Sequence, residues 1–546
     1  MIEVYQRGGL QDVLSSSQFQ QVHEQSLQDF LPLIELLKDQ PSERLLVCSR
    51  LLEKLPFQPI ISAKTAEALG ALNLPNEGLK ILDALYGRFD GGSLPENHAL
   101  LTSTYFSLVG LLPSLSTKVE ALISWCRSRP NDYLRLATSA NFLSQNIYGE
   151  QDLELLIVEW LPWILESILK LSSQYEDQVM AMAADLALAQ KNYAGAISLL
   201  SRSIELGNDK SANVEKLAYL YLSDQQMEKG FQETLKRDLR GKSPLLFEQF
   251  KSLDRVSSID ELRQLDLVYV LFEQGIGDQL IYSQYLFDLL PLVLCQITIV
   301  CETRMVSIVK RMLKEVILKR NLVDLNYSVV SEIESIGSSV GKIWLADIPF
   351  LLKQKRPSGL EASFLSAAGF SDYAKARAVV LNDSGFGSSR VGISWCGPGR
   401  KGGSRKDIPL SSWAPLLEAH PEIEFVSVQY GDERNAVDDF CRSAGLSIHV
   451  EDVDQILDLE AALDQLQTLD AVITTSSTVA HLAGSMGIPC AVLLPYVPLW
   501  YWEQQKNGQS LYYPSVHLIP RHQPNDLDSS IRQASDWLSF LSQESS

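Results

Sequence analysis

The stretch from residue 469 to residue 494 limits most strongly how the second half of this chain can fold. Apolar, partly β-branched residues at 471–473 predict a buried parallel strand. Five hydroxyl residues follow at 474–478, which suit a tight loop and a helix N-cap. Small residues at 479–486 then predict a helix close to a sheet, and a second strand is expected at 490–494. Such a unit leaves N–H groups free at the helix N-terminus as an anion site. An ordinary crossover with a serine-rich cap fits the same residues.

Strand and helix signals alternate from residue 265 to the C-terminus. Within 265–388, strands are expected at 265–272, 297–301, 322–325 and 341–343, with helices at 279–290 and 306–318. Within 389–546, strands at 391–396, 425–428 and 447–450 alternate with helices at 411–419, 432–444 and 458–466, and a helix is expected at the C-terminus. This alternation predicts two Rossmann-like domains, each with a parallel sheet covered by helices.

Residues 1–241 are predicted to be helical. The clearest unit contains Ala184, Tyr193 and Ala196, and 34 residues later Ala218, Met227 and Gly230 occupy the same places. This pattern resembles the tetratricopeptide repeat, in which stacked helix pairs form a superhelix with a concave face for a peptide or protein. A plain helical scaffold that dimerises, or that supports the second half, fits the pattern too. Residues 242–264 have no firm period, and we interpret them as a linker.

Composition excludes several classes of partner. The formal net charge of −20 argues against a nucleic-acid binder and against attachment to anionic lipid. The seven cysteines are scattered without a CxxC pair, which indicates free thiols in a reducing compartment. The apolar stretches 153–171 and 285–300 contain acidic residues, so no membrane span is predicted. With no signal peptide at the N-terminus, we expect a cytoplasmic protein.

Four motifs occur in a fixed order along the chain. They are EQGIGD at 273–278, SRKDIPL at 404–410, STVAHLAG at 477–484, and a tail with Leu499-Trp500 and YYPS at 512–515. Together they resemble bacterial proteins that fuse tetratricopeptide repeats to a glycosyltransferase domain related to lipopolysaccharide heptosyltransferases. The resemblance implies the GT-B fold, in which two Rossmann-like domains face one another across a cleft. It also implies transfer of a sugar from a nucleotide-sugar to a hydroxyl group, with a protein such as flagellin recruited by the repeats. The chain departs from this group at Ser476, where an Asp commonly stands.

Asp278 closes a turn that also contains Gln274, Gly275 and Gly277, where glycines let a backbone approach a ligand closely. The resemblance implies that Asp278 is the general base, which takes the proton from the acceptor hydroxyl. Direct displacement would then invert the anomeric configuration. The alternative is an Asp that caps the following helix.

The leaving nucleotide needs groups that stabilise negative charge. Candidates are Ser476, Ser477, Thr478 and the N–H groups that follow them. Lys406 matches the phosphate-binding cation of the resembling group, and Arg405 is the second choice. A solvated basic loop is the alternative for this segment.

The remaining candidates have weaker signals. His481 matches the group's histidine but also fits a packed core residue. Gln429 and Glu433 follow a predicted strand, where a carboxylate could bind ribose hydroxyls. Trp500 and Tyr513 are candidates for stacking on a base or sugar, although such aromatics also fit a core.

No His/Cys/Asp cluster has metal-ligand spacing, so neither a metal nor a cofactor is expected beside the nucleotide-sugar. Two rival functions stay open. One is a catalytically degenerate GT-B and repeat scaffold that binds a partner. The other is a heptosyltransferase acting on lipid-linked sugar, which the lack of a basic amphipathic surface disfavours. Repeat domains also dimerise readily, so a homodimer is compatible with the sequence.

Overall fold

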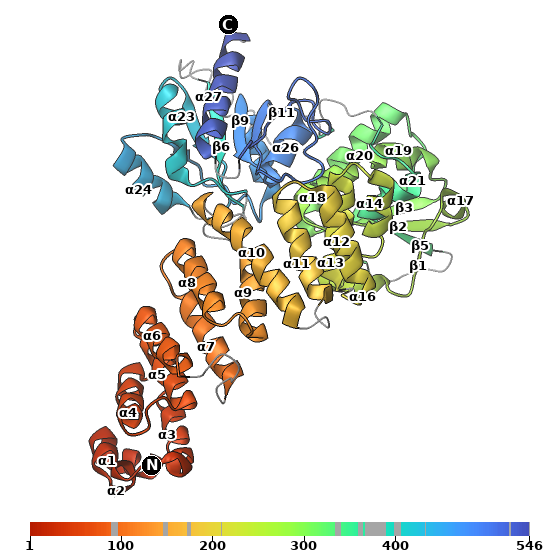
Figure 1. The fold of residues 1–546 in the computed structure, drawn as a ribbon. Coiled ribbons are helices and arrows are strands. Elements are labelled where there is room, and N and C mark those ends of the chain that lie inside the picture. Colours follow the sequence, from red (N-terminus) through yellow and green to blue (C-terminus); the bar gives the residue numbers. More distant parts are fainter. Residues whose placement is uncertain are drawn as a thin grey trace. The chain divides into compact units, whose positions relative to one another are not determined.

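The structure, a computed structural model, describes residues 1–88, 97–145, 151–171, 176–208, 210–333, 340–358, 364–365, 389–397, 406–431, 433–523 and 526–544. The chain divides into two compact units, Met1–Leu186 and Ala187–Ser546. Figure 1 shows the helical first unit in red to gold and the two sheets of the second unit in green and blue.

The described part of the first unit consists of helices joined by short turns. Neighbouring helices pack in sequence, as in the pairs α4 with α5, α5 with α6 and α9 with α10. No described helix combines the length and apolarity needed to cross a bilayer. The helices are α1 Ile2–Ser15, α2 Ser17–Gln20, η1 Glu24–Asp29, α3 Leu31–Leu36, α4 Pro41–Lys54, α5 Pro59–Ala71, α6 Pro75–Tyr86, α7 His98–Gly110, α8 Leu115–Ser128, α9 Tyr133–Gln145, α10 Gln151–Leu171 and α11 Glu176–Ala189, the last of which crosses the division between the units.

The second unit begins with five further helices, α12 Tyr193–Glu205, α13 Ser211–Ser223, α14 Met227–Thr234, α15 Leu239–Lys242 and α16 Pro244–Phe250. The small residue of the repeat pattern has a direct packing role here. A Cβ atom at Gly230 would lie 2.5 Å from Leu222 Cδ2, so α14 packs against α13 only with glycine at this position. The predicted helical character of the first 241 residues is confirmed over their described part.

Residues 242–264, interpreted as a linker, contain secondary structure. After α16 come β1 Asp254–Arg255 and α17 Ile259–Leu262, and β1 pairs in parallel with β5 of the first sheet. A strand of two residues is too short to produce a periodic signal, so this element is visible only through its pairing.

The first sheet has five parallel strands in the order β1-β5-β2-β3-β4. The predicted strand at 322–325 is wrong. α20 ends at Arg320, its C-cap Asn321 is in the left-handed region, and the apolar residues that follow pack from a turn before β4 begins. The strands are β2 Leu267–Leu271, β3 Gln296–Val300, β4 Tyr327–Val330 and β5 Val340–Trp344. The helices are α18 Ile276–Ser283, α19 Leu286–Leu289, η3 Leu290–Leu292, η4 Thr303–Met305, α20 Val306–Arg320, η5 Leu345–Asp347 and α21 Ile348–Leu352.

The second sheet has six parallel strands in the order β11-β10-β9-β6-β7-β8. β11 was not predicted, because its four residues follow an aromatic run that hides the alternation. The strands are β6 Arg390–Ser394, β7 Glu424–Ser427, β8 His449–Val450, β9 Ala471–Thr475, β10 Cys490–Leu493 and β11 Val516–Ile519. The helices are η6 Leu410–Trp413, α23 Ala414–Ala419, α24 Arg434–Ala444, α25 Leu459–Gln467, α26 Thr478–Met486 and α27 Leu527–Glu544.

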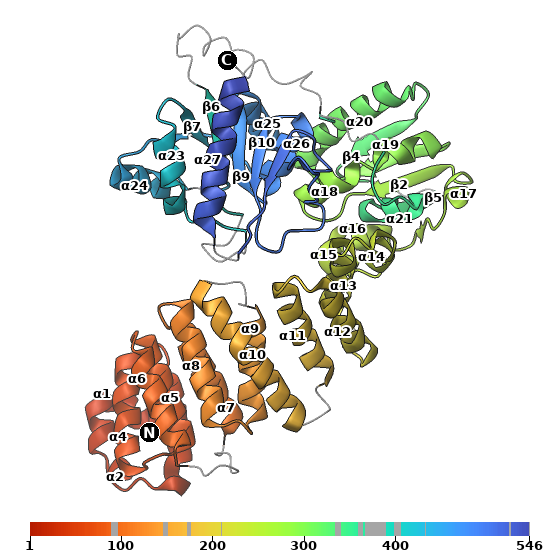
Figure 2. The ribbon, with the colours of Figure 1, turned by 45° about the horizontal axis from the view of Figure 1, so that its top comes forward.

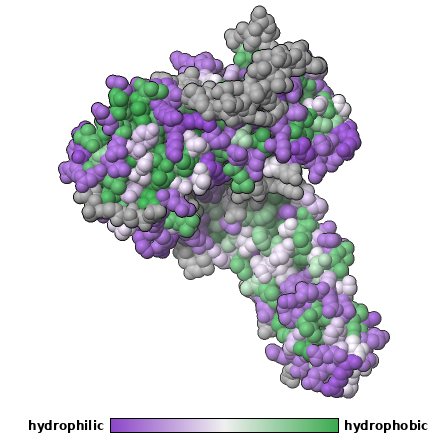
Figure 3. All heavy atoms as spheres, turned by 180° about the vertical axis from the view of Figure 1, so that it is seen from behind, coloured by the Kyte–Doolittle hydropathy of each residue, from purple (hydrophilic) through white to green (hydrophobic). Residues whose placement is uncertain are grey.

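The second unit therefore has the predicted α/β architecture, with two Rossmann-like sheets following helical repeats. Figure 2 shows α18 of the first sheet beside α26 of the second, and the two helices are in contact. On the face drawn in Figure 3, hydrophilic and hydrophobic residues are interspersed over the described surface. This arrangement of two parallel sheets is the GT-B fold, and it brings the carboxyl ends of strands from both sheets toward one place.

Candidate active site

A pocket of about 290 Å³ lies where the N-terminal turns of α18 and α26 meet. In the second sheet, chain order reverses between β6 and β9, and ligands of doubly wound sheets bind outside the carboxyl ends of the strands at such a point. The pocket is lined by segments that follow β2, β6 and β9, together with one residue of the loop after β10. Its lining residues are Gly275, Ile276, Gly277, Asp278, Gly397, Lys406, Ser476, Ser477, Thr478, His481 and Tyr501.

The turn before α18 carries Asp278 into this pocket. Gln274 has a φ of 85°, in the left-handed region, and its carbonyl accepts a hydrogen bond of 2.9 Å from Gln279 Nε2. Gly275 is the N-cap, and Asp278 lies in the first turn of the helix. A Cβ atom at Gly277 would lie 2.7 Å from Cδ2 of His481, so glycine is what allows α18 to approach α26.

Lys406 and Asp278 place opposite charges in the same pocket. Burial lowers the pKa of Lys406, and the Asp278 and Asp407 carboxylates oppose this shift. A partly desolvated ammonium group interacts more strongly with an anion than one in open water does. The pocket thus has a cation on the second-sheet side and a carboxylate on the first-sheet side.

The serine loop after β9 leads into the N-terminus of α26. The side chain of Ser477 does not cap the helix; its Oγ atom lies 3.0 Å from Thr474 Oγ1. Ser476 Oγ accepts a hydrogen bond of 2.8 Å from Trp502 Nε1. The first-turn N–H groups of α26 therefore receive no acceptor from the cap residue, and the positive end of the helix dipole is directed at the pocket.

His481 both lines the pocket and packs in the core. Burial, and to a lesser degree the charge of Lys406, lowers its pKa to about 3, so the ring is neutral. Its Nδ1 atom lies 3.1 Å from the Tyr513 hydroxyl, and its ring stacks on Trp502 with centroids 4.8 Å apart. Its place therefore fits both interpretations from the sequence, a residue of the ligand site and a packed core residue.

Four described candidates from the sequence lie outside the pocket lining, in addition to Gln274. Gln429 is buried behind the loop after β6, where its Oε1 accepts from Trp395 N at 2.8 Å and from Cys396 N at 3.0 Å. Glu433 is the N-cap of α24. Trp500 is buried among aromatic rings, and the Tyr513 hydroxyl lies beside Nδ1 of the lining residue His481.

Arg405 lies outside the described residues. Sequence reasoning missed Ile276, Gly397 and Tyr501 as lining residues. The first two adjoin recognised glycine-rich segments, which is a usable signal. Tyr501 is one of several aromatic residues in a row, and nothing in the sequence distinguishes it from its neighbours.

Among the described residues, no group of three or more His, Cys, Asp or Glu side chains could hold a metal ion, and metal independence stays a prediction.

Neither a family model nor a curated protein matches this chain. Solved structures that resemble it include a glycosyl transferase family 9 protein from Veillonella parvula, with 13% identity and a TM-score of 0.36 over 53% of this chain and 100% of that one. The E. coli ADP-heptose lps heptosyltransferase II has 12% identity and a TM-score of 0.32 over 51% of this chain and 100% of that one. A Thermobaculum terrenum O-GlcNAc transferase mutant has 13% identity and a TM-score of 0.25 over 80% of this chain and 90% of that one.

Proposed function

We propose that this chain is an inverting glycosyltransferase that moves a sugar from a nucleotide-sugar to a hydroxyl acceptor. The observation that carries the proposal is that Asp278 lines the same pocket as Lys406 and the N-terminus of α26. A nucleotide-sugar places a diphosphate directly beside its anomeric carbon. A site for this donor needs an anion cradle next to a base, which is what these residues provide.

In this reaction the acceptor oxygen bonds to the anomeric carbon while the bond from that carbon to the diphosphate oxygen breaks. The acceptor proton passes to Asp278, which is the one carboxylate among the described lining residues. The electron pair leaves with the nucleotide, where Lys406 and the N–H groups of α26 stabilise the charge. A single displacement inverts the anomeric carbon, and neutral His481 offers a hydrogen bond without adding charge.

The acceptor in this proposal is a protein hydroxyl, Ser or Thr, brought to the pocket by the helical repeats. Stacked helix pairs with small residues at their contacts support a binding role, because such arrays form extended surfaces for peptides. Flagellin is the acceptor that the sequence resemblance suggests.

The donor site can be tested by thermal shift of the full chain with UDP, GDP, ADP, CMP and their sugars. A ligand that binds only the folded state raises its stability by RT ln(1 + [L]/Kd). We expect a shift with one nucleotide that is lost in Lys406→Ala and kept in Lys314→Ala, a control at an exposed position of α20. No shift with any nucleotide would instead favour the scaffold.

The base can be tested separately. Asp278→Asn should keep the nucleotide-induced shift but lose transfer by roughly 100-fold or more, as general-base catalysis contributes on that scale. Transfer at the wild-type rate by Asp278→Asn would contradict the base assignment.

Metal independence is tested by adding EDTA to the transfer assay of the wild type. The transfer rate should be unchanged, since no metal takes part in the proposed step.

A further inference from the structure

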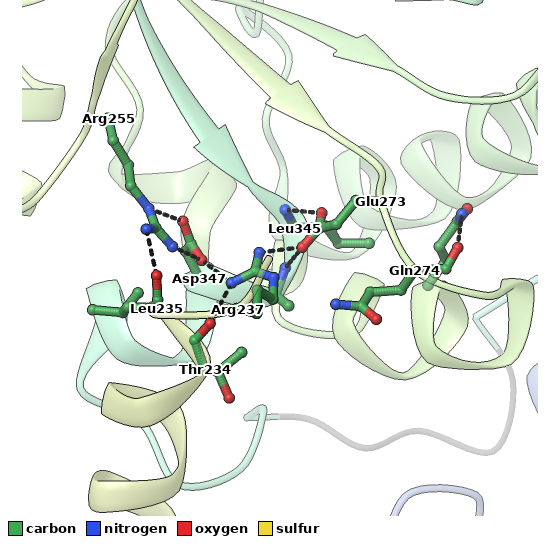
Figure 4. A network of polar contacts seen from close by, with 10 residues as sticks. Thr234, Leu235, Arg237, Arg255, Glu273, Gln274, Leu345 and Asp347 are labelled. Atoms are coloured by element: carbon green, nitrogen blue, oxygen red, sulfur yellow. Dashed lines mark hydrogen bonds and ion pairs between the residues drawn. The ribbon is translucent and has the colours of Figure 1, made fainter. Parts of the chain in front are cut away.

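Four buried or partly buried charged residues form a chain of ion pairs next to the turn that carries Asp278 (Figure 4). Arg237 pairs with both Glu273 and Asp347, and Asp347 also pairs with Arg255. The network has two arginines and two carboxyl groups; burial raises the pKa of Glu273, and the Arg237 guanidinium opposes this rise. Glu273 is 1% exposed and Arg237 is 5% exposed, so the pair at the centre has little access to water.

Glu273 occupies the place where the strand order of the first sheet reverses. It follows β2, and its carboxylate accepts backbone hydrogen bonds from Leu345 at 3.0 Å and Ala346 at 3.4 Å, at the start of η5 after β5. β2 and β5 are neighbours in the sheet. The crevice that holds a ligand in many doubly wound sheets is here filled by a side chain of the protein itself.

Arg237 reaches this crevice from the helical segment. It lies between α14 and α15, and its Nη1 atom donates to Asp347 Oδ1 at 2.7 Å and to Thr234 O at 2.8 Å. Arg255 Nη1 donates to Leu235 O at 2.8 Å in the same segment. Burial acts to lower the pKa of Arg237, but the Glu273 and Asp347 carboxylates outweigh it and hold the guanidinium charged. These contacts fix the C-terminal end of α14 to the segments that follow the strands of the first sheet.

The same network sits one residue from a strained backbone. Gln274, directly after Glu273, has positive φ, and such strain persists only where the surrounding structure over-determines it. Gly275 and Gly277 follow, and flexible glycines do not hold the position of Asp278 by themselves. The fixed end of this turn is Glu273.

From this geometry we infer that Glu273 is a positioning residue for Asp278. Arg237, which follows the helix pair α13 and α14, holds Glu273 in place, so these helices help to position the active site. This inference rests on the proposed function. A base displaced by about 1 Å loses rate far more than it loses donor affinity, because only the reacting geometry changes.

The test compares Glu273→Gln with wild type in the full chain. The assay is release of nucleotide from the nucleotide-sugar that the thermal-shift panel selects, with water as acceptor, so no protein acceptor is needed. We expect kcat to fall roughly 10- to 100-fold while KM for the donor stays within about 2-fold. Arg237→Gln should give the same split, and the double variant should lose no more than the worse single one, since the two residues act as a unit.

The matched control is Glu451→Gln. Glu451 pairs with Arg390 at 2.9 Å with both side chains about equally buried, but at the N-terminal end of β6, away from the pocket. Its loss should lower thermal stability without changing kcat. If Glu273→Gln does not fold, Arg237→Lys, which keeps the charge, takes its place.

Hydrogen exchange gives a readout without turnover. In Glu273→Gln the amides of residues 274–279 should exchange faster while those of β2 stay protected. Unchanged kcat and unchanged exchange at 274–279 would overturn the inference, as would equal loss of kcat in Glu451→Gln. Failure of the proposed function looks different: then no nucleotide binds, or Asp278→Asn transfers at the wild-type rate.

Discussion

At the scale of single residues, burial decides the chemistry of the pocket. Lys406 and His481 lie on the same side of it, and burial lowers the pKa of both. The lysine has carboxylates nearby that favour its charged form, whereas the histidine has a lysine nearby that disfavours it. The result is one cation and one neutral ring, and the cation is where the leaving phosphate is expected.

His481 gives a pH prediction with a definite sign. Its pKa is about 3 when folded, below the ordinary 6.5, so the unfolded chain binds a proton that the folded chain does not. The stability that neutral His481 contributes is complete above pH 6.5 and is lost as pH falls toward 3, by up to about 1.4 kcal/mol per pH unit. Urea unfolding of wild type and His481→Gln at pH 7.5 and pH 5 checks this. The stability advantage of wild type should shrink at pH 5, and an advantage that is constant or grows would contradict the shift.

The residue types that line the pocket could be predicted because the glycines, the serines and Lys406 lie in loops with a recognisable sequence pattern. What Gln429 does could not be predicted. Its amide satisfies backbone groups of the loop after β6, and that pairing exists only once β6 and β7 lie side by side. A sequence shows that a polar residue follows a strand; it does not show whether the side chain faces a ligand or a neighbouring loop.

At the scale of elements, most strands and helices of the second unit follow from hydrophobic patterns, while β1, β11 and the true place of β4 do not. Short strands lack a period, and their place depends on pairing with a neighbour. The strand order is likewise invisible in the sequence, yet it is what puts the carboxyl ends of β6 and β9 together at the pocket.

The loop after β10 offers a prediction at this scale. Trp502 donates to Ser476 and stacks on His481, so it holds the serine loop against α26. Trp502→Phe keeps a ring but removes the hydrogen bond, which is worth about 1 kcal/mol. We expect the Kd of the nucleotide to rise about 5-fold by calorimetry, with the fold retained. Trp537→Phe, in α27, is the control and should leave Kd unchanged; an unchanged Kd in Trp502→Phe would show that the serine loop needs no such support.

At the scale of the whole molecule, helical periodicity and compactness divide the chain at different places. The repeat pattern continues to about residue 241, whereas the compact second unit already begins at Ala187. Periodicity reports that a segment is a helix with one apolar face, but it does not report which partner covers that face. Here Met227 and Phe231 of α14 belong to the same buried cluster as the strands β2 and β3.

Two truncations test this division. A chain of residues 190–546 retains α12–α16 and the whole Arg237 network, so it should fold and show the same nucleotide-induced thermal shift as the full chain. It should also still hydrolyse the nucleotide-sugar with water as acceptor, while transfer to a protein acceptor falls if the removed helices recruit that acceptor.

A chain of residues 242–546 lacks Arg237 and leaves buried Glu273 without its partner, at a cost of about 3–5 kcal/mol. It also exposes the apolar surface that α14 covers. Because whole proteins are stable by only about 5–15 kcal/mol, this shorter chain should be aggregated or partly unfolded by circular dichroism and size-exclusion chromatography. A monomeric, nucleotide-binding 242–546 fragment would show that the sheets fold without α12–α15, and it would contradict the positioning role of Arg237.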